Sequence, residues 1–443
     1  MKKALSILLI LALICVPLAA CGGAETPAGS DTPPAGGTDT PPAGGGETPA
    51  EPPPPPPAGA ETRDVTLTMW GGEEDQAMLR IIADTFIAEK LPEIASQAGI
   101  HFNLTIEIGV EGEGTLSSTL LTDPQAGADV FAFPDDQMMQ LYLGSALQEV
   151  LINADAIKAA NAGGAVDAAM VDGVLYAYPL TADNGYFLYY DKSVLSESDV
   201  ASWDSMMDAA HAAGMQVTFP MGIGWFNIAF FRAAGLDAWV GADGISTESN
   251  INGPKGTDVA QAMLDLAAHP GFISLGGDEA TTGAHNGTIA AFVSGPWDAN
   301  AASDAWGDNY AATKLPTVNI GGTQTQMGGV LGCKLIGVNA FSQEVGLAMH
   351  LAEWVSNYQN QMLRFEMRSQ GPSNIEAAAN PAVQANIALA AMAKQAQFSK
   401  FFSPGDNYWG NADALGNILA DGNPDNTPLQ ELLDNAVAAM TGG

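Results

Sequence analysis

The chain has 443 residues, and its 50 acidic residues against 15 Lys and Arg give a formal net charge of −35 at pH 7. This charge argues against nucleic acid and phosphate-rich ligands as partners and favours a neutral or cationic ligand. The part from Asp64 onward is too long for one comfortable hydrophobic core, so two lobes are expected.

The N-terminus has the pattern of a signal peptide, residues 1–20. Lys2 and Lys3 precede an apolar run that is short for a membrane span, and the run ends in Leu-Ala-Ala followed by Cys21. This ending resembles the lipobox of bacterial lipoproteins. It implies that Cys21 becomes the N-terminus, carries acyl chains such as palmitate, and holds the protein on the outer face of the cell membrane. The alternative is an ordinary signal peptide with an incidental cysteine.

Residues 21–63 are predicted to be a disordered linker that begins at the lipidated cysteine. They repeat Pro, Gly, Ala and Thr and contain almost nothing apolar to bury. Because proline-rich chain is extended, the linker would hold a folded domain away from the membrane. Beyond it the only cysteine is Cys333, which lies in an apolar stretch and is expected in the core, so the mature fold has no internal disulfide.

Strands and helices alternate after the linker, which predicts an α/β fold. Val65, Leu67 and Met69 alternate with polar residues as in a strand, and Gly71-Gly72 ends it before a helix that begins with acidic residues. Asp129–Phe133 is continuously apolar after its first residue, as in a strand buried on both faces. Further strands are expected at Leu104–Ile108, Gln216–Phe219, Thr288–Val293 and Lys334–Asn339, and helices at Phe226–Ala234, Thr257–Ala268, Val345–Val355 and over most of the chain from Pro381.

Five segments occur in an order that resembles extracellular solute-binding proteins of the maltose/maltodextrin-binding type (family 1), the substrate-binding components of ABC transporters. They are VTLTMWGG (65–72), GADVFAFPDD with GSALQEV (127–150), DGVLYAYPLTADNGYFLYYDK (172–192), AAFVSGPWDAN with NYAATKLP (290–316) and GGVLGCKLIGVNAFS (328–342). The resemblance implies a two-lobe periplasmic-binding-protein-like fold (type II) with the ligand cleft between the lobes. It also implies that a sugar or oligosaccharide is bound by lobe closure and delivered to membrane permease subunits.

On this resemblance the chain crosses between the lobes near Ala182–Gly185, Gly328–Gly332 and Glu376–Ala379. The expected lobe 1 is residues 64–182 plus 332–378, and lobe 2 is residues 183–331 plus 379–443. Glycines at the first two crossings suit hinge rotation, although ordinary turns explain them equally well.

Sugars present an apolar ring face, on which aromatic side chains stack, and hydroxyl groups, which bind carboxylates and amides. Trp297 follows Gly295-Pro296 at a strand end, where the family has a stacking tryptophan. Phe133 and Asp136 follow the buried strand at the edge where open α/β sheets place ligands. Each aromatic has the alternative of lying in the core.

The remaining candidates also follow strands or lie in polar loops: Trp70, Glu73, Glu74, Asp183, Asn184, Trp225, Tyr408 and Trp409. Glu73 and Glu74 have the alternative of capping a helix. Two departures from the maltodextrin binders put maltose itself in doubt: Phe133 stands where tryptophan is common, and Gln137 replaces a basic residue. Asn184 aligns with a glutamate of the maltose binders.

Enzyme motifs are absent from the sequence: there is no G-x-S-x-G elbow, no P-loop and no H-E-x-x-H. The five histidines are scattered, and the residues after Asp421 lack the glycine and the glutamate of a calcium loop. We therefore expect a binding protein with no catalysis, cofactor or metal. The alternatives are a binder of a cationic or peptide-like solute, a surface glycosidase that uses two carboxylates, and an adhesin.

Overall fold

The computed structural model describes residue 59 and residues 61–442. The expected signal peptide, Cys21 and nearly all of the expected linker lie outside the described residues. In the described part of the chain, no helix is long and apolar enough to cross a membrane.

The first of two five-stranded sheets has the order β2-β1-β3-β17-β6. Strand β1 (Glu61–Gly71) pairs in parallel with β2 (Ile100–Val110) along its whole length, and with β3 (Val130–Pro134) only at its end. β17 (Lys334–Val338) runs antiparallel to β3 and to β6 (Tyr178–Pro179). The strand predicted around Val65 is confirmed, but it begins at Glu61, inside the segment expected to be linker.

The second sheet has the order β11-β8-β12-β7-β13. Its strands are β7 (Phe187–Asp191), β8 (Gln216–Thr218), β11 (Phe272–Ile273), β12 (Ile289–Ser294) and β13 (Tyr310–Thr313). Strand β7 is antiparallel to its neighbours β12 and β13, whereas β8 and β12 are parallel. All residues of β12 are buried, as expected for a central strand.

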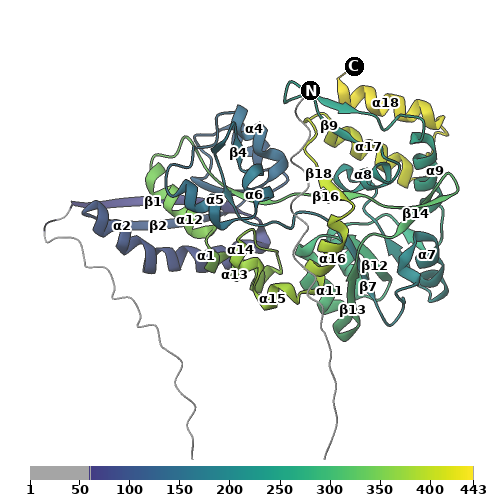
Figure 1. Cartoon of the computed structure of the whole chain (residues 1–443), viewed down its shortest axis with the longest axis horizontal. Helices are drawn as coiled ribbons and strands as arrows, with labels where there is room; N and C mark the ends of the chain where they lie inside the picture. Colours follow the sequence, from purple (N-terminus) through teal and green to yellow (C-terminus); the bar gives the residue numbers. More distant parts are fainter. Residues whose placement is uncertain (1–58, 60, 443) are drawn as a thin grey trace, which may run out of the picture. The chain divides into compact units, whose positions relative to one another are not determined.

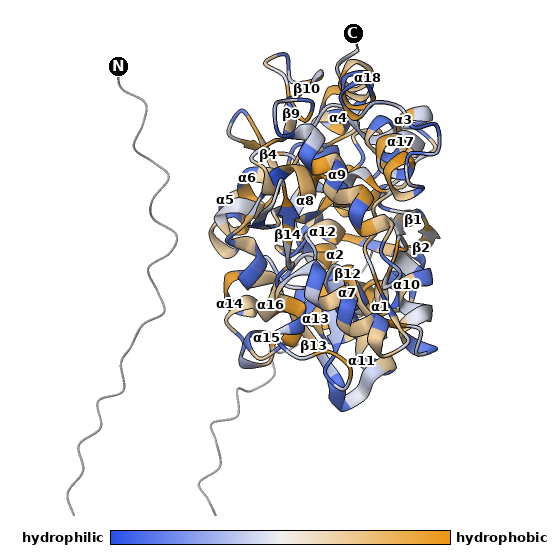
Figure 2. Cartoon of the chain, turned by 90° about the vertical axis from the view of Figure 1, so that its right-hand side faces the viewer, coloured by the Kyte–Doolittle hydropathy of each residue, from blue (hydrophilic) through white to orange (hydrophobic). Residues whose placement is uncertain are grey.

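Helices cover both sheets and complete separate hydrophobic cores. The first core includes residues of α1 (Gln76–Thr85), α2 (Leu91–Ala98) and α12 (Val345–Val355), and the second residues of α7 (Trp203–Ala212), α8 (Gly224–Ala233), α9 (Gly256–Ala267), α17 (Tyr408–Ala420) and α18 (Leu429–Thr441). Helix α9 is amphipathic, with hydrophilic and hydrophobic segments alternating along it in Figure 2. The predicted α/β fold with two lobes is therefore confirmed.

The chain passes three times between the two sheets. The first two passages lie between β6 and β7 and between β13 and β17. The third lies between α13 (Tyr358–Arg368), which packs on α1 and α12, and α16 (Ile387–Ala396), which packs on β13. We place the proposed lobe boundaries, 182/183, 331/332 and 378/379, within these passages.

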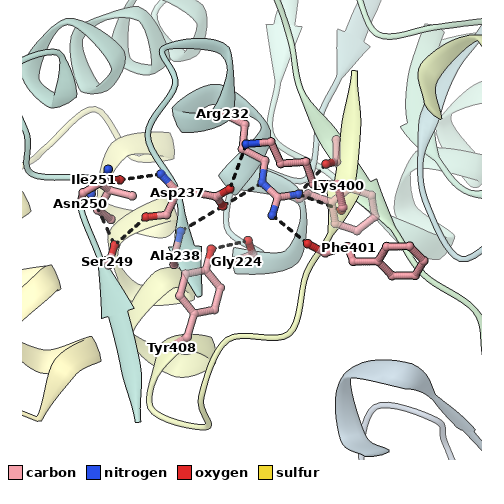
Figure 3. Close-up of polar contacts among 12 residues, drawn as sticks. Gly224, Arg232, Asp237, Ala238, Ser249, Asn250, Ile251, Lys400, Phe401 and Tyr408 are labelled. Carbon is pink, nitrogen blue, oxygen red and sulfur yellow. Dashed lines mark hydrogen bonds and ion pairs between the residues drawn. The ribbon is translucent and has the colours of Figure 1, made fainter. Parts of the chain in front are cut away.

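Arg232 of α8 connects two short strands at the second passage. Strand β16 (Gly329–Leu331) pairs in parallel with β18 (Ser399–Phe401), a strand in the region predicted to be mostly helical. The Arg232 guanidinium donates to the carbonyls of Gly329 at 2.6 Å and Lys400 at 3.2 Å, and pairs with Asp237 at 2.9 Å (Figure 3). One side chain thus ties α8 to both strands.

Cys333 precedes β17 and is buried, as predicted. Burial and then the neighbouring carboxylate of Asp135 raise the pKa of its thiol well above the usual range. It is the only cysteine among the described residues.

Candidate ligand-binding site

A cavity of about 720 Å³ is lined by residues that follow strands of both sheets. From the first sheet and its loops come Glu74, Glu113, Asp136, Gln137 and Lys334; from the second lobe come Trp225, Trp297, Asp406, Trp409 and Asp413; Asn184 lies in the first passage. Glu74 and Asp136 follow the C-terminal ends of the parallel strands β1 and β3, the edge at which α/β sheets bind ligands.

Trp297 is held in the cavity by the turn that follows β12. Gly295-Pro296 ends the strand, and a short 3₁₀ helix (Pro296–Asp298) turns the chain. The Tyr189 hydroxyl donates to the Gly295 carbonyl at 2.9 Å and fixes this turn. The Trp297 ring folds back over Gly295, where an added Cβ would overlap the ring. The φ of Gly295, −93°, suits any residue, so the backbone does not require glycine here. Glycine is needed because a side chain would not fit beside the Trp297 ring.

Two further indoles lie at the starts of helices. Trp225 is the second residue of α8, and its ring centroid is 5.9 Å from that of Trp297. Trp409 is the second residue of α17 and packs edge-on against Phe402 at 5.7 Å. All three tryptophans are half-buried, so each has a packed side and a side that contributes to the cavity. The Asp413 carboxylate accepts from the Gly224 amide at 2.6 Å and fixes the start of α8.

Two neighbouring carboxyl groups follow β3. Asp135 accepts from the Cys333 amide at 2.9 Å, and burial raises its pKa to about 6. Burial, followed by repulsion from Asp135 and Glu113, raises the pKa of Asp136 to about 7. Asp136 can therefore carry a proton near neutral pH and either donate to or accept from a ligand hydroxyl.

An ammonium group joins the carboxylates in the cavity. The Lys334 side chain is only 8% exposed, and its Nζ lies 2.8 Å from Glu113 Oε2 and 5.7 Å from the centroid of the Trp297 ring. Sequence reasoning missed both Lys334 and Glu113. A lysine inside the apolar run of β17 was the available signal for the first, whereas nothing in the sequence marks Glu113.

Hydrogen bonds join the two lobes beside the cavity. Gln140 donates to Asp406 at 3.3 Å, and both residues line the cavity. Asn300 donates to the Met367 carbonyl at 3.1 Å and accepts from the Ser369 hydroxyl at 2.9 Å. These contacts cross between elements of the two lobes, and the bond between Gln140 and Asp406 lies in the cavity lining.

A buried ion pair supports the loop that carries Glu74. Asp75 binds Arg364 at 2.7 Å and Arg368 at 3.0 Å, and Arg368 also lies 3.5 Å from Glu74. Burial opposes ionisation of Asp75, but the charges of Arg364, Lys334 and Arg368 and the hydrogen bond from Arg364 together outweigh it and lower the pKa of Asp75. The pair is structural, since neither Asp75 nor Arg364 lines the cavity.

The predicted site residues fall into two groups. Glu74, Asp136, Asn184, Trp225, Trp297 and Trp409 line the cavity, whereas Trp70, Glu73, Phe133, Asp183 and Tyr408 do not.

The five predicted residues that do not line the cavity are packed in the fold or, in the case of Glu73, exposed on its surface. Phe133 is fully buried in the first core, and Tyr408 is 1% exposed and donates to the Gly224 carbonyl at 2.9 Å. Asp183 is buried and accepts from the Gly371 amide, and burial raises its pKa. Trp70 packs against the first core, while Glu73 is exposed in the 3₁₀ helix after β1. We therefore leave these five out of the proposed site.

Comparison with known proteins agrees with a ligand-binding cavity between two α/β lobes. The family model described as bacterial extracellular solute-binding protein matches residues 94–391, more than half of the chain. The chain belongs to this family. The solute-binding protein is 26% identical over 338 residues to the galactooligosaccharide-binding protein of Bacillus subtilis (strain 168), covering 71% of this chain and 77% of that protein.

Solved structures share the fold of this solute-binding protein. A structure solved with acarbose has a TM-score of 0.76 at 28% identity and covers 86% of this chain and 99% of that one. The maltotriose-binding protein of Thermus thermophilus, bound with maltotriose, has a TM-score of 0.69 at 19% identity and covers 85% and 99%. The family consists of extracellular binding proteins, so this chain is an extracytoplasmic solute-binding protein. Within the described residues, no cluster of His, Cys, Asp and Glu could hold a metal ion.

Proposed function

We propose that this solute-binding protein binds a sugar or oligosaccharide in the cavity by lobe closure and delivers it to the permease subunits of an ABC importer. The proposal rests on one observation: Trp225, Trp297 and Trp409 line the same cavity as several carboxyl and amide groups. Aromatic faces suit the apolar side of a sugar ring, and oxygen-rich side chains suit its hydroxyl groups.

The proposed ligand contacts are Glu74, Asp136, Asn184, Trp225, Trp297 and Trp409, while Glu113 and Lys334 line the cavity as a pair. The cavity volume falls within the range of sites that enclose small ligands. The likeness to a galactooligosaccharide-binding protein and to a structure solved with acarbose supports an oligosaccharide rather than a single sugar.

A screen of the protein by thermal shift and calorimetry tests this proposal. The panel contains galactooligosaccharides, maltotriose, monosaccharides, amino acids and polyamines. We expect a saturable, stoichiometric response to at least one oligosaccharide, with smaller scattering dimensions in the complex and no product by chromatography. A response to amino acids alone contradicts sugar binding, and released product indicates a glycosidase. Binding to polymer without a change in dimensions indicates an adhesin.

A cationic solute is the second candidate, because the cavity is strongly acidic. Its lining includes the carboxyl groups of Glu74, Asp406 and Asp413, and its one ammonium group, Lys334, is already paired with Glu113. Binding of a polyamine without any sugar response would support this candidate. Its affinity would fall steeply with added salt, whereas that of a neutral sugar would not.

We further propose that Cys21 is acylated and anchors the protein to the membrane. The support is the Leu-Ala-Ala-Cys sequence after the apolar run. Mass spectrometry of the N-terminal peptide from membranes should show the acyl chains. Cys21→Ala should release the protein into the medium, and retention of that variant in the membrane contradicts the anchor.

A further inference from the structure

Lys334 is fixed by its backbone in the first lobe. It is the first residue of β17, its carbonyl accepts from the amides of Leu180 and Thr181, and its amide donates to the Thr181 hydroxyl at 3.2 Å. The base of the side chain therefore cannot shift without disturbing the sheet.

The ammonium group has two partners of different kinds. Glu113 Oε2, at 2.8 Å, compensates the charge, which would be costly to bury alone. The Trp297 ring, with its centroid 5.7 Å from Nζ, offers its negative π-face to the same cation. Because Lys334 is only 8% exposed, water screens neither contact well.

The contact between Lys334 and Trp297 crosses between the lobes, whereas the pair with Glu113 lies within the first lobe. Glu113 and Lys334 belong to loops and strands of the first sheet, whereas Trp297 follows β12 of the second. Rotation of one lobe away from the other would separate the ammonium from the ring. The free energy of this contact therefore favours the arrangement in which the lobes approach.

We propose that Lys334 is a positioning residue that couples stacking of the ligand on Trp297 to lobe closure. The ammonium holds the indole at the cavity wall, so that a ligand meets a ring already fixed between the lobes. The coupling deepens the sugar-binding function proposed above and rests on it. No atom of Lys334 needs to touch the ligand for this role.

A double-mutant cycle tests the coupling. Dissociation constants for the best oligosaccharide are measured for the wild type, Lys334→Met, Trp297→Leu and the double variant. We expect Lys334→Met to weaken binding about tenfold, Lys334→Arg to restore most of the affinity, and the double variant to bind no more weakly than Trp297→Leu alone. Additive losses would overturn the proposal, because Lys334 would then act independently of the ring.

Lys314→Met is the matched control. Its ammonium lies 5.4 Å from the centroid of the Phe398 ring, a similar contact outside the cavity lining. We expect this variant to bind like the wild type. An equal loss of affinity in Lys314→Met would show that removing any such contact weakens binding, and would contradict a specific role of Lys334.

Measurements without ligand separate this proposal from the proposed function. If Lys334 favours the approach of the lobes, small-angle scattering of ligand-free Lys334→Met should give a larger radius of gyration than the wild type. Unchanged dimensions would overturn the coupling even if sugar binds. Absence of sugar binding in the wild type, with enlarged dimensions in Lys334→Met, would refute the sugar and keep the interlobe contact. If Lys334→Met does not fold, Lys334→Gln, which also removes the charge from the Trp297 ring, provides the same comparison.

Discussion

The rings of Trp225 and Trp297 lie with their centroids 5.9 Å apart and their planes inclined by 45°. Trp225 is braced by edge-on contacts with Tyr186 and Phe226, at 4.8 and 4.9 Å. The two indoles thus form one angled wall of the cavity, and neither can rotate freely. A rigid aromatic wall limits the entropy lost when a ligand binds.

Trp297→Ala should weaken binding of the oligosaccharide at least tenfold, or by ~1.4 kcal/mol. The ring is half-buried and faces the cavity, so we expect only a modest change in melting temperature. Calorimetry and thermal unfolding of the same sample check both statements. Trp239→Ala is the control, because Trp239 is 41% exposed and lies outside the cavity lining. Equal losses of affinity and stability in Trp297→Ala would place Trp297 in the core instead.

Gly295→Ala should also weaken binding, although no ligand contact is removed. A Cβ at residue 295 would overlap the Trp297 ring and displace it, an overpacking effect that typically amounts to about 1–3 kcal/mol. Gly346→Ala, where an added Cβ meets open space, should leave affinity unchanged. Titration calorimetry of the two variants decides. If Gly295→Ala binds the ligand with wild-type affinity, the observed position of the Trp297 ring is not required for binding.

Asp136→Asn should change how stability depends on pH. The pKa of Asp136 is raised to about 7, so between about pH 4 and 7 the folded protein binds a proton that the unfolded chain does not. The contribution of Asp136 to the free energy of unfolding is therefore fully present below about pH 4 and is lost as the pH rises through 7.

Melting temperatures from pH 5 to 8 should fall less steeply in Asp136→Asn than in the wild type. Asp167→Asn, at an exposed position outside the lining, serves as control. Parallel profiles for the wild type and Asp136→Asn would show that Asp136 does not titrate in this range.

Arg364→Met should destabilise the fold by about 3–5 kcal/mol at pH 7, because it leaves the carboxylate of Asp75 buried without its main partner. Since the pKa of Asp75 is lowered, this stability exists above the unfolded pKa and is lost as the pH falls through the folded pKa. Urea unfolding should therefore show a smaller difference in the free energy of unfolding between Arg364→Met and the wild type at pH 3 than at pH 7.

Glu93→Gln breaks a partly exposed ion pair with Lys90 and should cost less than about 1 kcal/mol. If Arg364→Met costs no more than this control, the buried pair contributes little to the fold.

The lobes were predictable from the sequence because strand alternation and buried apolar runs are local signals. Within such a run the ligand-facing residue is not identifiable, since every residue from Val130 to Phe133 is buried. The cavity lining begins one residue later, at Pro134, and Phe133 remains in the core. A similar ambiguity affected Tyr408 and Trp409. Neighbours on a helix point about 100° apart, so one is buried while the other reaches the cavity.

Contacts between distant segments were not predictable. Glu113 and Lys334 are far apart in the sequence, and only Lys334 lies in one of the five matching segments. Strand β18 is only three residues long, too short to show an alternating pattern. It is stabilised by pairing with β16, which is distant in the sequence, so its local sequence does not predict a strand.

The buried thiol of Cys333 makes the protein suitable for fluorescence labelling. A thiol with a raised pKa reacts slowly with maleimide dyes, and the chain has only two other cysteines, Cys15 and Cys21. With those two replaced by serine, cysteines introduced at the exposed positions Asp155 and Asp265 would accept a donor and an acceptor dye. Single-molecule energy transfer would then follow each opening and closing event in real time.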